Sequence, residues 1–172
     1  AGDVGVSDDT EKRWIKELEK SGIVFFLHPY SNNLLKRAIK TPKMYFFDTG
    51  LVCYLTRYSN PEILMNGAIN GAILENYVVS EIIKTYSNSA KDCLLHYYRD
   101  KNSNEIDLIM ESDGQLHPIE IKKSINPPTQ ITGAFKLLDK ASVPRGTGAI
   151  ICLREKLSAI DSSTYIVPVW MI

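Results

Sequence analysis

Apolar and polar positions near the start of the chain predict one helix followed by one strand. The helix spans residues 7–22, where Ser7 is suited to cap the N-terminus, acidic residues follow in the first turn, and Gly22 is typical of a helix end. The apolar stretch 23–30 then predicts a strand that ends at Pro29.

A polar and basic connection leads from this strand to a longer series of elements after Pro42. A short apolar strand precedes Asp48, which is suited to cap a short helix. Apolar residues at helical spacing predict a longer helix over residues 66–89, and Glu75 lies within that pattern. Three strands, a helix and two more strands are predicted next, over residues 93–100, 104–111, 115–123, 128–142, 147–153 and 164–172.

The order of these elements predicts two units. From residue 67 onward the order is α-β-β-β-α-β with an extra strand, which predicts an α/β fold with a mixed sheet and helices on both faces. Residues 43–172 are predicted to form this domain, and Pro168 in its last strand indicates a sheet edge or a bulge. Residues 1–42 resemble the end of a winged-helix unit, which enters a DNA groove in some proteins and packs against other domains in others. The acidic residues of its helix disfavour contact with phosphates, and both roles stay open.

The dipeptide Asp113-Gly114 predicts a two-residue type I′ turn between the strands 104–111 and 115–123. With this turn fixed, residues whose numbers sum to 227 stand opposite each other. Asp107 then faces Glu120, and Glu105 faces Lys122, all on one face. On the same face, Ile109 stands opposite Pro118 and Glu111 opposite Leu116. The other face is predicted to be core, and it carries three further pairs: Ile106 with Ile121, Leu108 with Ile119, and Met110 with His117.

Two carboxylates directly opposite each other destabilise a strand pair, and Lys122 relieves this only partly because Glu105 competes for it. A divalent cation such as Mg²⁺ or Mn²⁺ between Asp107 and Glu120 resolves the conflict, and Lys122 then points at a water or a phosphate rather than serving as counter-ion. The competing interpretation is a solvated strand face with alternating charges. Spacing alone does not decide between the two.

Composition narrows the class of protein. Twenty basic and twenty acidic residues give a net charge of zero, so a nucleic-acid contact requires a local basic patch. Cys53, Cys93 and Cys152 form no CxxC pair and are expected to be small buried side chains in a reducing compartment. The sequence has no signal peptide and no apolar run of membrane-spanning length, so the chain is expected to be cytoplasmic. It begins with Ala1 rather than Met and is expected to be a fragment.

Asp107 followed by Glu120-Ile121-Lys122 on the next strand resembles the D…(D/E)xK signature of the PD-(D/E)xK nuclease superfamily, which has the restriction-endonuclease-like fold. The resemblance implies that Glu75 is an additional carboxylate on the preceding helix. It also places Gln130, on the following helix, where some members carry a supporting polar residue. Ile106 stands where the named pattern has proline, a departure that many members share.

A closer resemblance is to the C-terminal domain, called domain of unknown function 4143, of bacterial and archaeal AAA+-type ATPases. Four blocks of this sequence carry it in order: "TPKMYFFDTGL", "GAILENYVVSEI", "YYRDKNSNEIDLIM" and "IEIKKS", within about residues 41–124. The sequence contains no GxxxxGK[ST] motif, so no ATP site is expected on this chain. The resemblance implies an N-terminal ATPase domain of the same protein as a partner.

The resemblance implies metal-dependent phosphodiester hydrolysis with Mg or Mn. Asp107, Glu120, Glu75 and the carbonyl of Ile121 are the expected metal ligands, and Lys122 is expected to orient or deprotonate the attacking water. Arg99 is a candidate for binding a phosphate, but a surface salt bridge with Asp100 or Glu105 is the favoured explanation. DNA is the expected substrate. A non-catalytic module that binds DNA or protein, or that forms a homo-oligomer, remains the alternative.

Overall fold

A computed structural model describes residues 2–30, 40–92 and 94–172. Cys93 and most of the basic connection lie outside these residues. The first described element is the short 3₁₀ helix η1 (Gly2–Val4). The further elements of the first half follow in this order: α1 (Asp8–Lys20), β1 (Val24–Leu27), β2 (Lys43–Phe46), α2 (Thr49–Leu55), α3 (Pro61–Asn66) and α4 (Asn70–Asn88). The second half contains β3 (Leu94–Arg99), β4 (Glu105–Ser112), β5 (Gln115–Lys122), η2 (Thr129–Lys140), β6 (Gly148–Cys152), β7 (Ser158–Ala159), β8 (Thr164–Pro168) and η3 (Val169–Met171).

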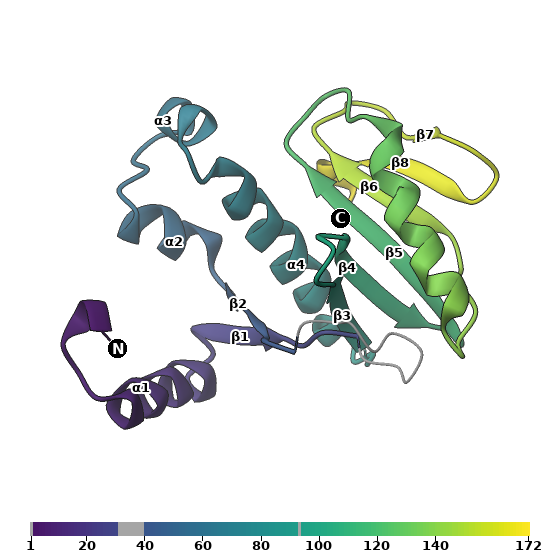
Figure 1. The fold of residues 1–172 in the computed structure, drawn as a ribbon. Coiled ribbons are helices and arrows are strands. Elements are labelled where there is room, and N and C mark those ends of the chain that lie inside the picture. Colours follow the sequence, from purple (N-terminus) through teal and green to yellow (C-terminus); the bar gives the residue numbers. More distant parts are fainter. Residues whose placement is uncertain (1, 31–39, 93) are drawn as a thin grey trace.

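A mixed six-stranded sheet in the order β3-β4-β5-β6-β8-β7 forms the centre of the molecule (Figure 1). The β3–β4, β4–β5 and β7–β8 pairs are antiparallel, and the β5–β6 and β6–β8 pairs are parallel. The mixed α/β class predicted from the sequence is therefore confirmed. Strand β7 pairs only with Tyr165 and Ile166, so Pro168 at the end of β8 lies where that edge is locally open.

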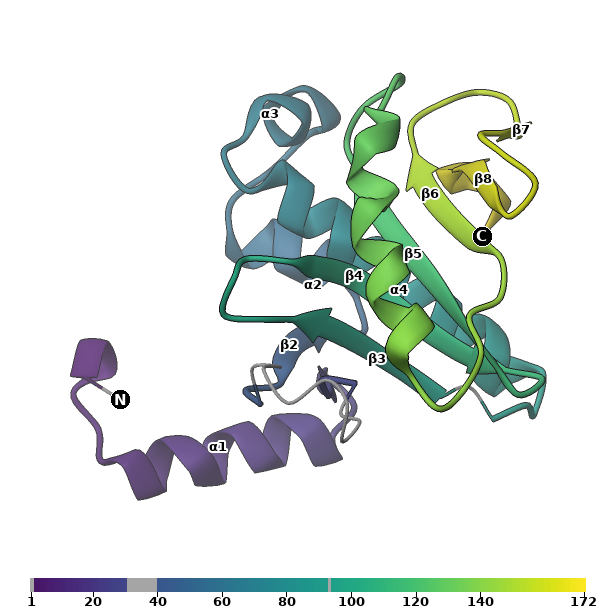
Figure 2. The same ribbon diagram turned by 45° about the vertical axis from the view of Figure 1, so that its right-hand side comes forward.

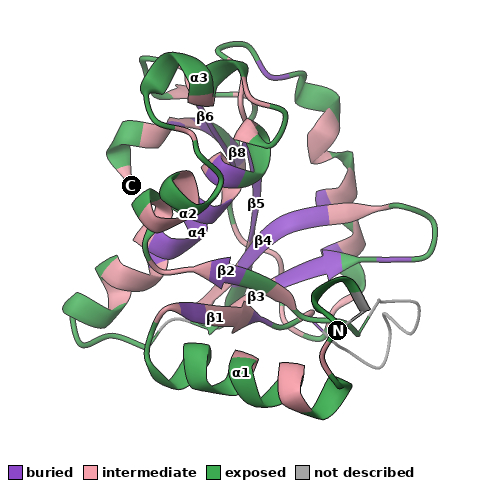
Figure 3. Cartoon of the chain, turned by 90° about the vertical axis from the view of Figure 1, so that its left-hand side faces the viewer, coloured by how far each residue is buried: buried purple, intermediate pink, exposed green. Residues whose placement is uncertain are grey.

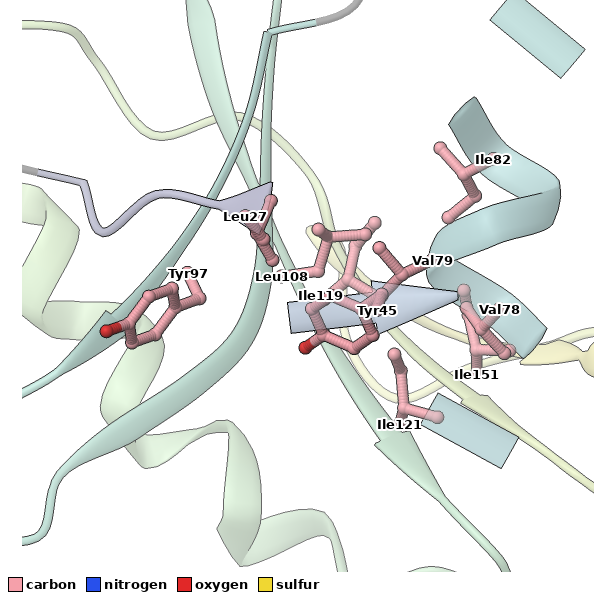
Figure 4. Close-up of a cluster of buried hydrophobic side chains, with 10 residues drawn as sticks. All are labelled: Leu27, Tyr45, Val78, Val79, Ile82, Tyr97, Leu108, Ile119, Ile121 and Ile151. Atoms are coloured by element: carbon pink, nitrogen blue, oxygen red, sulfur yellow. The ribbon is translucent and has the colours of Figure 1, made fainter. Parts of the chain in front are cut away.

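Helices cover both faces of the sheet, and the apolar side chains of the strands divide between them. On one face, Leu108, Ile119 and Ile121 pack with Val79 of α4 (Figure 4). On the other face, Ile109 and Leu116 pack with Phe135 and Leu138 of η2. The helix predicted over residues 128–142 has 3₁₀ geometry. Because both faces of β4 and β5 are buried, the prediction that only one face is core is wrong.

The first part of the chain forms a smaller layer beside this sheet. Strands β1 and β2 pair antiparallel across the predicted domain boundary at residues 42 and 43. The backbone N–H of Tyr30 donates to the carbonyl of Tyr97 on β3 at 2.7 Å, which joins the small sheet to the large one. Helix α1 extends from this layer and has no buried residue (Figures 2 and 3). It is capped by Ser7, as predicted from the sequence.

Side chains on α4 and near α2 complete the fold. Asn76 of α4 is buried, and its amide bonds both backbone groups of Phe46 at the outer edge of β2, at 2.8 and 3.0 Å. Asp48 caps α2, as predicted. Cys152 is buried and Cys53 is half-buried, in line with small packed side chains. Among the described helices, none is both long and apolar enough to cross a membrane.

Candidate metal site on the β4–β5 hairpin

The β4–β5 hairpin has the register that its turn predicts. Asp113 and Gly114 have φ angles of 51° and 72°, and two left-handed residues are the requirement of a type I′ turn. Ile109 pairs with Pro118 and Leu108 pairs with Ile119, so the sum of 227 holds along the ladder. The prediction that these strands form a tight hairpin with this register is therefore confirmed.

The ladder between β4 and β5 stops at Leu108, just before the acidic positions. On the other side of β4, the register against β3 shifts, so that Asp107 and Leu108 together stand opposite the single residue Tyr97. This is a β-bulge, which bends a strand and redirects its side chains. As a result, Ile106 packs on the η2 face and Leu108 on the α4 face, and the prediction that they share one face is wrong.

Asp107, Glu120 and Lys122 come together at this bulge and are called the acidic triad below. Asp107 and Glu120 are 7% and 5% exposed. The ammonium of Lys122 lies 3.0 Å from Asp107 Oδ2 and 2.8 Å from Glu120 Oε2. Asp107 Oδ2 also accepts a hydrogen bond from the backbone N–H of Ile121 at 2.8 Å. The carboxylate thus supplies the acceptor that a neighbouring strand would otherwise provide for this backbone group of β5. Two buried acids thus share one cation.

One ammonium is insufficient for two buried carboxylates, and the pKa values reflect this. Burial, together with the negative charge of Asp107, raises the pKa of Glu120 to about 8. Burial opposes the charge of Lys122, but its contacts with Glu120 and Asp107 raise the pKa of the ammonium above its ordinary value. At neutral pH the triad therefore retains a proton as well as the lysine charge.

Lys122 is the counter-ion of both carboxylates, and the orientation predicted for it applies to a site that holds a cation. The prediction that Glu105 competes for Lys122 is wrong. Glu105 does not compete for it, because Glu105 Oε1 lies 2.8 Å from Lys43 and Glu105 Oε2 lies 3.9 Å from Arg99. The cause is the bulge at Asp107, which separates Glu105 from the part of β4 that runs beside β5.

Glu75 lies on α4 and has its own partners. Its Oε1 atom accepts a hydrogen bond from the Tyr45 hydroxyl at 2.6 Å and contacts Lys43 Nζ at 3.0 Å. Within the residues that the structure describes, no three His, Cys, Asp or Glu side chains are grouped closely enough to hold a metal ion. The structure therefore does not bring Glu75 together with Asp107 and Glu120.

The donor set nevertheless fits one kind of metal ion. Mg²⁺ is commonly bound through one or two carboxylates, with waters and substrate oxygens in the other positions. Asp107 and Glu120 supply two adjacent buried carboxylates, and their existing partner Lys122 occupies the position of a cation. These residues fit an ion held by two carboxylates, with Lys122 displaced, and do not form a cage of three.

The remaining predicted residues have lesser roles in this geometry. Arg99 is about half exposed, and its Nε atom lies 3.9 Å from Glu105 Oε2, which is a long contact. Gln130 is exposed at the start of η2 and makes none of the hydrogen bonds that join the acidic triad. Ile121 is joined to Asp107 through its backbone N–H. The structure thus centres the candidate site on the triad.

Sequence reasoning missed Lys43 and Tyr45, which hold Glu75. Both lie on β2, two positions apart, and residues at this spacing share a face of a strand. The spacing of Lys43 and Tyr45 was a usable signal that the two side chains lie on the same face of the strand. The identity of their shared partner could not be predicted, because 32 positions separate Lys43 from Glu75.

Comparison with known proteins gives a family but no described activity. Two uncharacterized proteins, from Mycobacterium bovis and Mycobacterium tuberculosis, are each 28% identical over 139 residues, which cover 81% of this chain and 31% of the relative. The chain thus spans about a third of the length of these relatives. No solved structure matches it significantly.

Two family profiles match successive parts of the chain. Residues 1–62 match a domain of unknown function, DUF8612. Residues 70–172 match another domain of unknown function, DUF4143, and they include α4 and the acidic triad. Since this second match spans more than half of the chain, the protein belongs to the DUF4143 family.

Proposed function

We propose that Asp107 and Glu120 bind a divalent cation, Mg²⁺ or Mn²⁺, and that the site hydrolyses phosphodiester bonds in DNA. The observation that carries the proposal is the burial of two adjacent carboxylates with only one lysine between them. Placing uncompensated acids in a protein interior is costly, and catalytic sites are where such groups concentrate. The order Asp…Glu-x-Lys on two adjacent strands supports a PD-(D/E)xK-type site.

Each residue of the acidic triad has a definite task under this proposal. Asp107 and Glu120 would provide ligand oxygens, and the carbonyl of Ile121, the residue between Glu120 and Lys122, is the proposed backbone ligand. A bound divalent ion would supply charge for the phosphate and would make water a stronger nucleophile. A bound cation would take the place of Lys122 between the two acids. The ammonium of Lys122 would then stay near the site and orient a water or neutralise a phosphate oxygen.

We further propose that the domain acts as part of a larger protein with an AAA+-type ATPase. The four sequence blocks described above support this, and so does the length of the relatives, which is about three times the matched region. No nucleotide-binding loop is present in this sequence, so ATP would be bound elsewhere in such a protein.

A second candidate is a non-catalytic module that binds DNA or protein. The observation that favours it is that the Lys122 ammonium lies 3.0 Å from Asp107 and 2.8 Å from Glu120 and so supplies part of the positive charge that the two acids need. In that case the triad is a structural ion pair, and its residues matter for folding alone.

Calorimetric titration with Mn²⁺ tests the first proposal. The wild type should bind Mn²⁺ at micromolar to millimolar concentrations. Asp107→Asn should raise the dissociation constant for Mn²⁺ by at least about tenfold, because a ligand charge is removed. Asp113→Asn is the matched control: it makes the same change on the same hairpin, at an exposed turn residue, and should bind as the wild type does. Equal affinity in all three proteins would exclude the proposed ligands.

Nicking of supercoiled plasmid in the presence of Mn²⁺ tests the chemistry separately. Lys122→Met should lose nicking while Lys101→Met, a matched change at an exposed turn residue, retains it. DNA binding without nicking by the wild type would support the non-catalytic module instead.

A further inference from the structure

Glu75 is held by two donors from one strand. The Tyr45 hydroxyl donates to Glu75 Oε1 at 2.6 Å, and Lys43 Nζ lies 3.0 Å from the same oxygen. Tyr45 is almost fully buried, and Lys43 and Glu75 expose about a quarter of their side chains. This contact joins α4 to β2 and fixes the carboxylate on the β2 side.

Lys43 has a second acidic partner. Its ammonium lies 2.8 Å from Glu105 Oε1 and 5.1 Å from the centre of the Tyr97 ring. Burial disfavours the charged ammonium, but Glu75 and Glu105 outweigh it and raise the pKa of Lys43. Lys43 therefore stays charged, and it would keep Glu105 as a partner if Glu75 moved away.

Glu75 is accessible as well as held. It lines a groove of about 360 Å³ together with Lys43 and Tyr45. Two Oε1 contacts therefore fix a carboxylate that is not enclosed by protein on every side. A carboxylate held in this way can exchange its partners at a lower cost than a fully buried one.

We propose that Lys43 and Tyr45 form a latch that holds Glu75 apart from Asp107 and Glu120 and thereby limits divalent-cation binding at the acidic triad. This inference rests on the proposed metal site. The latch separates the observed arrangement, in which Glu75 is held by β2, from one in which Glu75 joins Asp107 and Glu120 as a third ligand. Lys43 and Tyr45 are positioning residues in this account, since they act through Glu75.

Removing the latch should tighten cation binding. Lys43→Met removes one positive charge and frees Glu75, so we expect Mn²⁺ affinity measured by calorimetry to rise by about fivefold or more. Lys43→Arg keeps the charge and should bind as the wild type does. Tyr45→Phe removes the other donor without changing charge, and it should tighten binding by a smaller factor. It also serves as the second variant if Lys43→Met fails to fold.

Double substitutions separate the latch from a general effect of charge. In the Lys43→Met background, Glu75→Gln should abolish the gain, whereas Glu105→Gln should preserve most of it. Both double variants carry the same net charge, so only the identity of the freed carboxylate differs. If the two double variants lose the gain equally, or if Lys43→Met fails to tighten binding, the latch is excluded.

The outcomes also separate this inference from the proposed function. Mn²⁺ binding that tightens in Lys43→Met, together with no nicking by any variant, supports the latch and excludes hydrolysis. Mn²⁺ binding by the wild type that Lys43→Met does not tighten excludes the latch alone. No Mn²⁺ binding by the wild type or by Lys43→Met excludes both.

Discussion

The acidic triad shows how two acids are buried side by side in one protein. Lys122 contributes one positive charge to Asp107 and Glu120, and the raised pKa of Glu120 indicates that a proton offsets the rest. The sequence predicted that Asp107, Glu120 and Lys122 lie close together, because the Asp113-Gly114 turn fixes which residues of β4 and β5 stand opposite each other. The partners of Glu75 could not, because they depend on the distant packing of α4 against β2.

This proton makes stability depend on pH. Folded Glu120 retains a proton up to about pH 8, whereas the unfolded chain releases it near its ordinary pKa of 4.5. The folded state binds more protons in this window, so the free energy of unfolding should fall as the pH rises, by at most about 1.4 kcal/mol per pH unit. Urea denaturation in the presence of a chelator, at several pH values across the window, measures it.

Two variants isolate the contribution of Glu120. Glu120→Gln cannot ionise, so its stability relative to the wild type should increase with pH across the window. Glu111→Gln, a matched change on the same hairpin, should follow the wild type. A constant difference between Glu120→Gln and the wild type at every pH would contradict the assigned pKa.

The register of the β4–β5 hairpin could be predicted from the sequence, but the bulge in β4 could not. Its register was predictable because Asp113 and Gly114 specify a two-residue turn with left-handed backbone at both positions. The bulge at Asp107 was not predictable, because the alternation of side chains along β4 contains no signal for an extra residue opposite Tyr97. Both faces of β4 are buried, so apolar residues are compatible with either face and do not show where the alternation changes.

Glycine substitution on this hairpin tests the turn. Gly114→Ala places a side chain at a φ of 72° and should lower the free energy of unfolding by about 1–2 kcal/mol. Gly71→Ala makes the same change near the start of α4, where no atom lies within 4 Å of the added carbon, and should leave stability unchanged or raise it slightly. Thermal or urea unfolding gives both values; equal effects would show that the turn does not need glycine.

In the whole molecule, the two predicted units are joined by more than a linker. Strand β1 pairs with β2, and Leu27 of β1 packs in the same cluster as Tyr45 and Val79. Helix α1, by contrast, contributes no buried residue. The sequence showed the change in character near Pro42, but strand pairing across that point depends on residues far apart in the chain and is not visible in local patterns.

Truncation at two points distinguishes these parts. A chain that starts at Ile23 lacks α1 and should keep most of its stability, because no buried side chain is lost. A chain that starts at Lys43 also loses Val24 and Leu27, which are 1% and 3% exposed, and each should cost about 1.5–3 kcal/mol. Differential scanning calorimetry of both chains tests this, and equal melting temperatures would show that β1 is dispensable.

The contact between Tyr30 and Tyr97 also bears on solubility. Strand β3 is the outer strand of the large sheet, and the segment after β1 covers part of its edge through hydrogen bonds at His28 and Tyr30. An open edge is a template on which another chain can add a strand, and so a route to aggregation. Residues 28–30 therefore shield part of this edge from self-association, and a chain that lacks them would expose that part to other molecules.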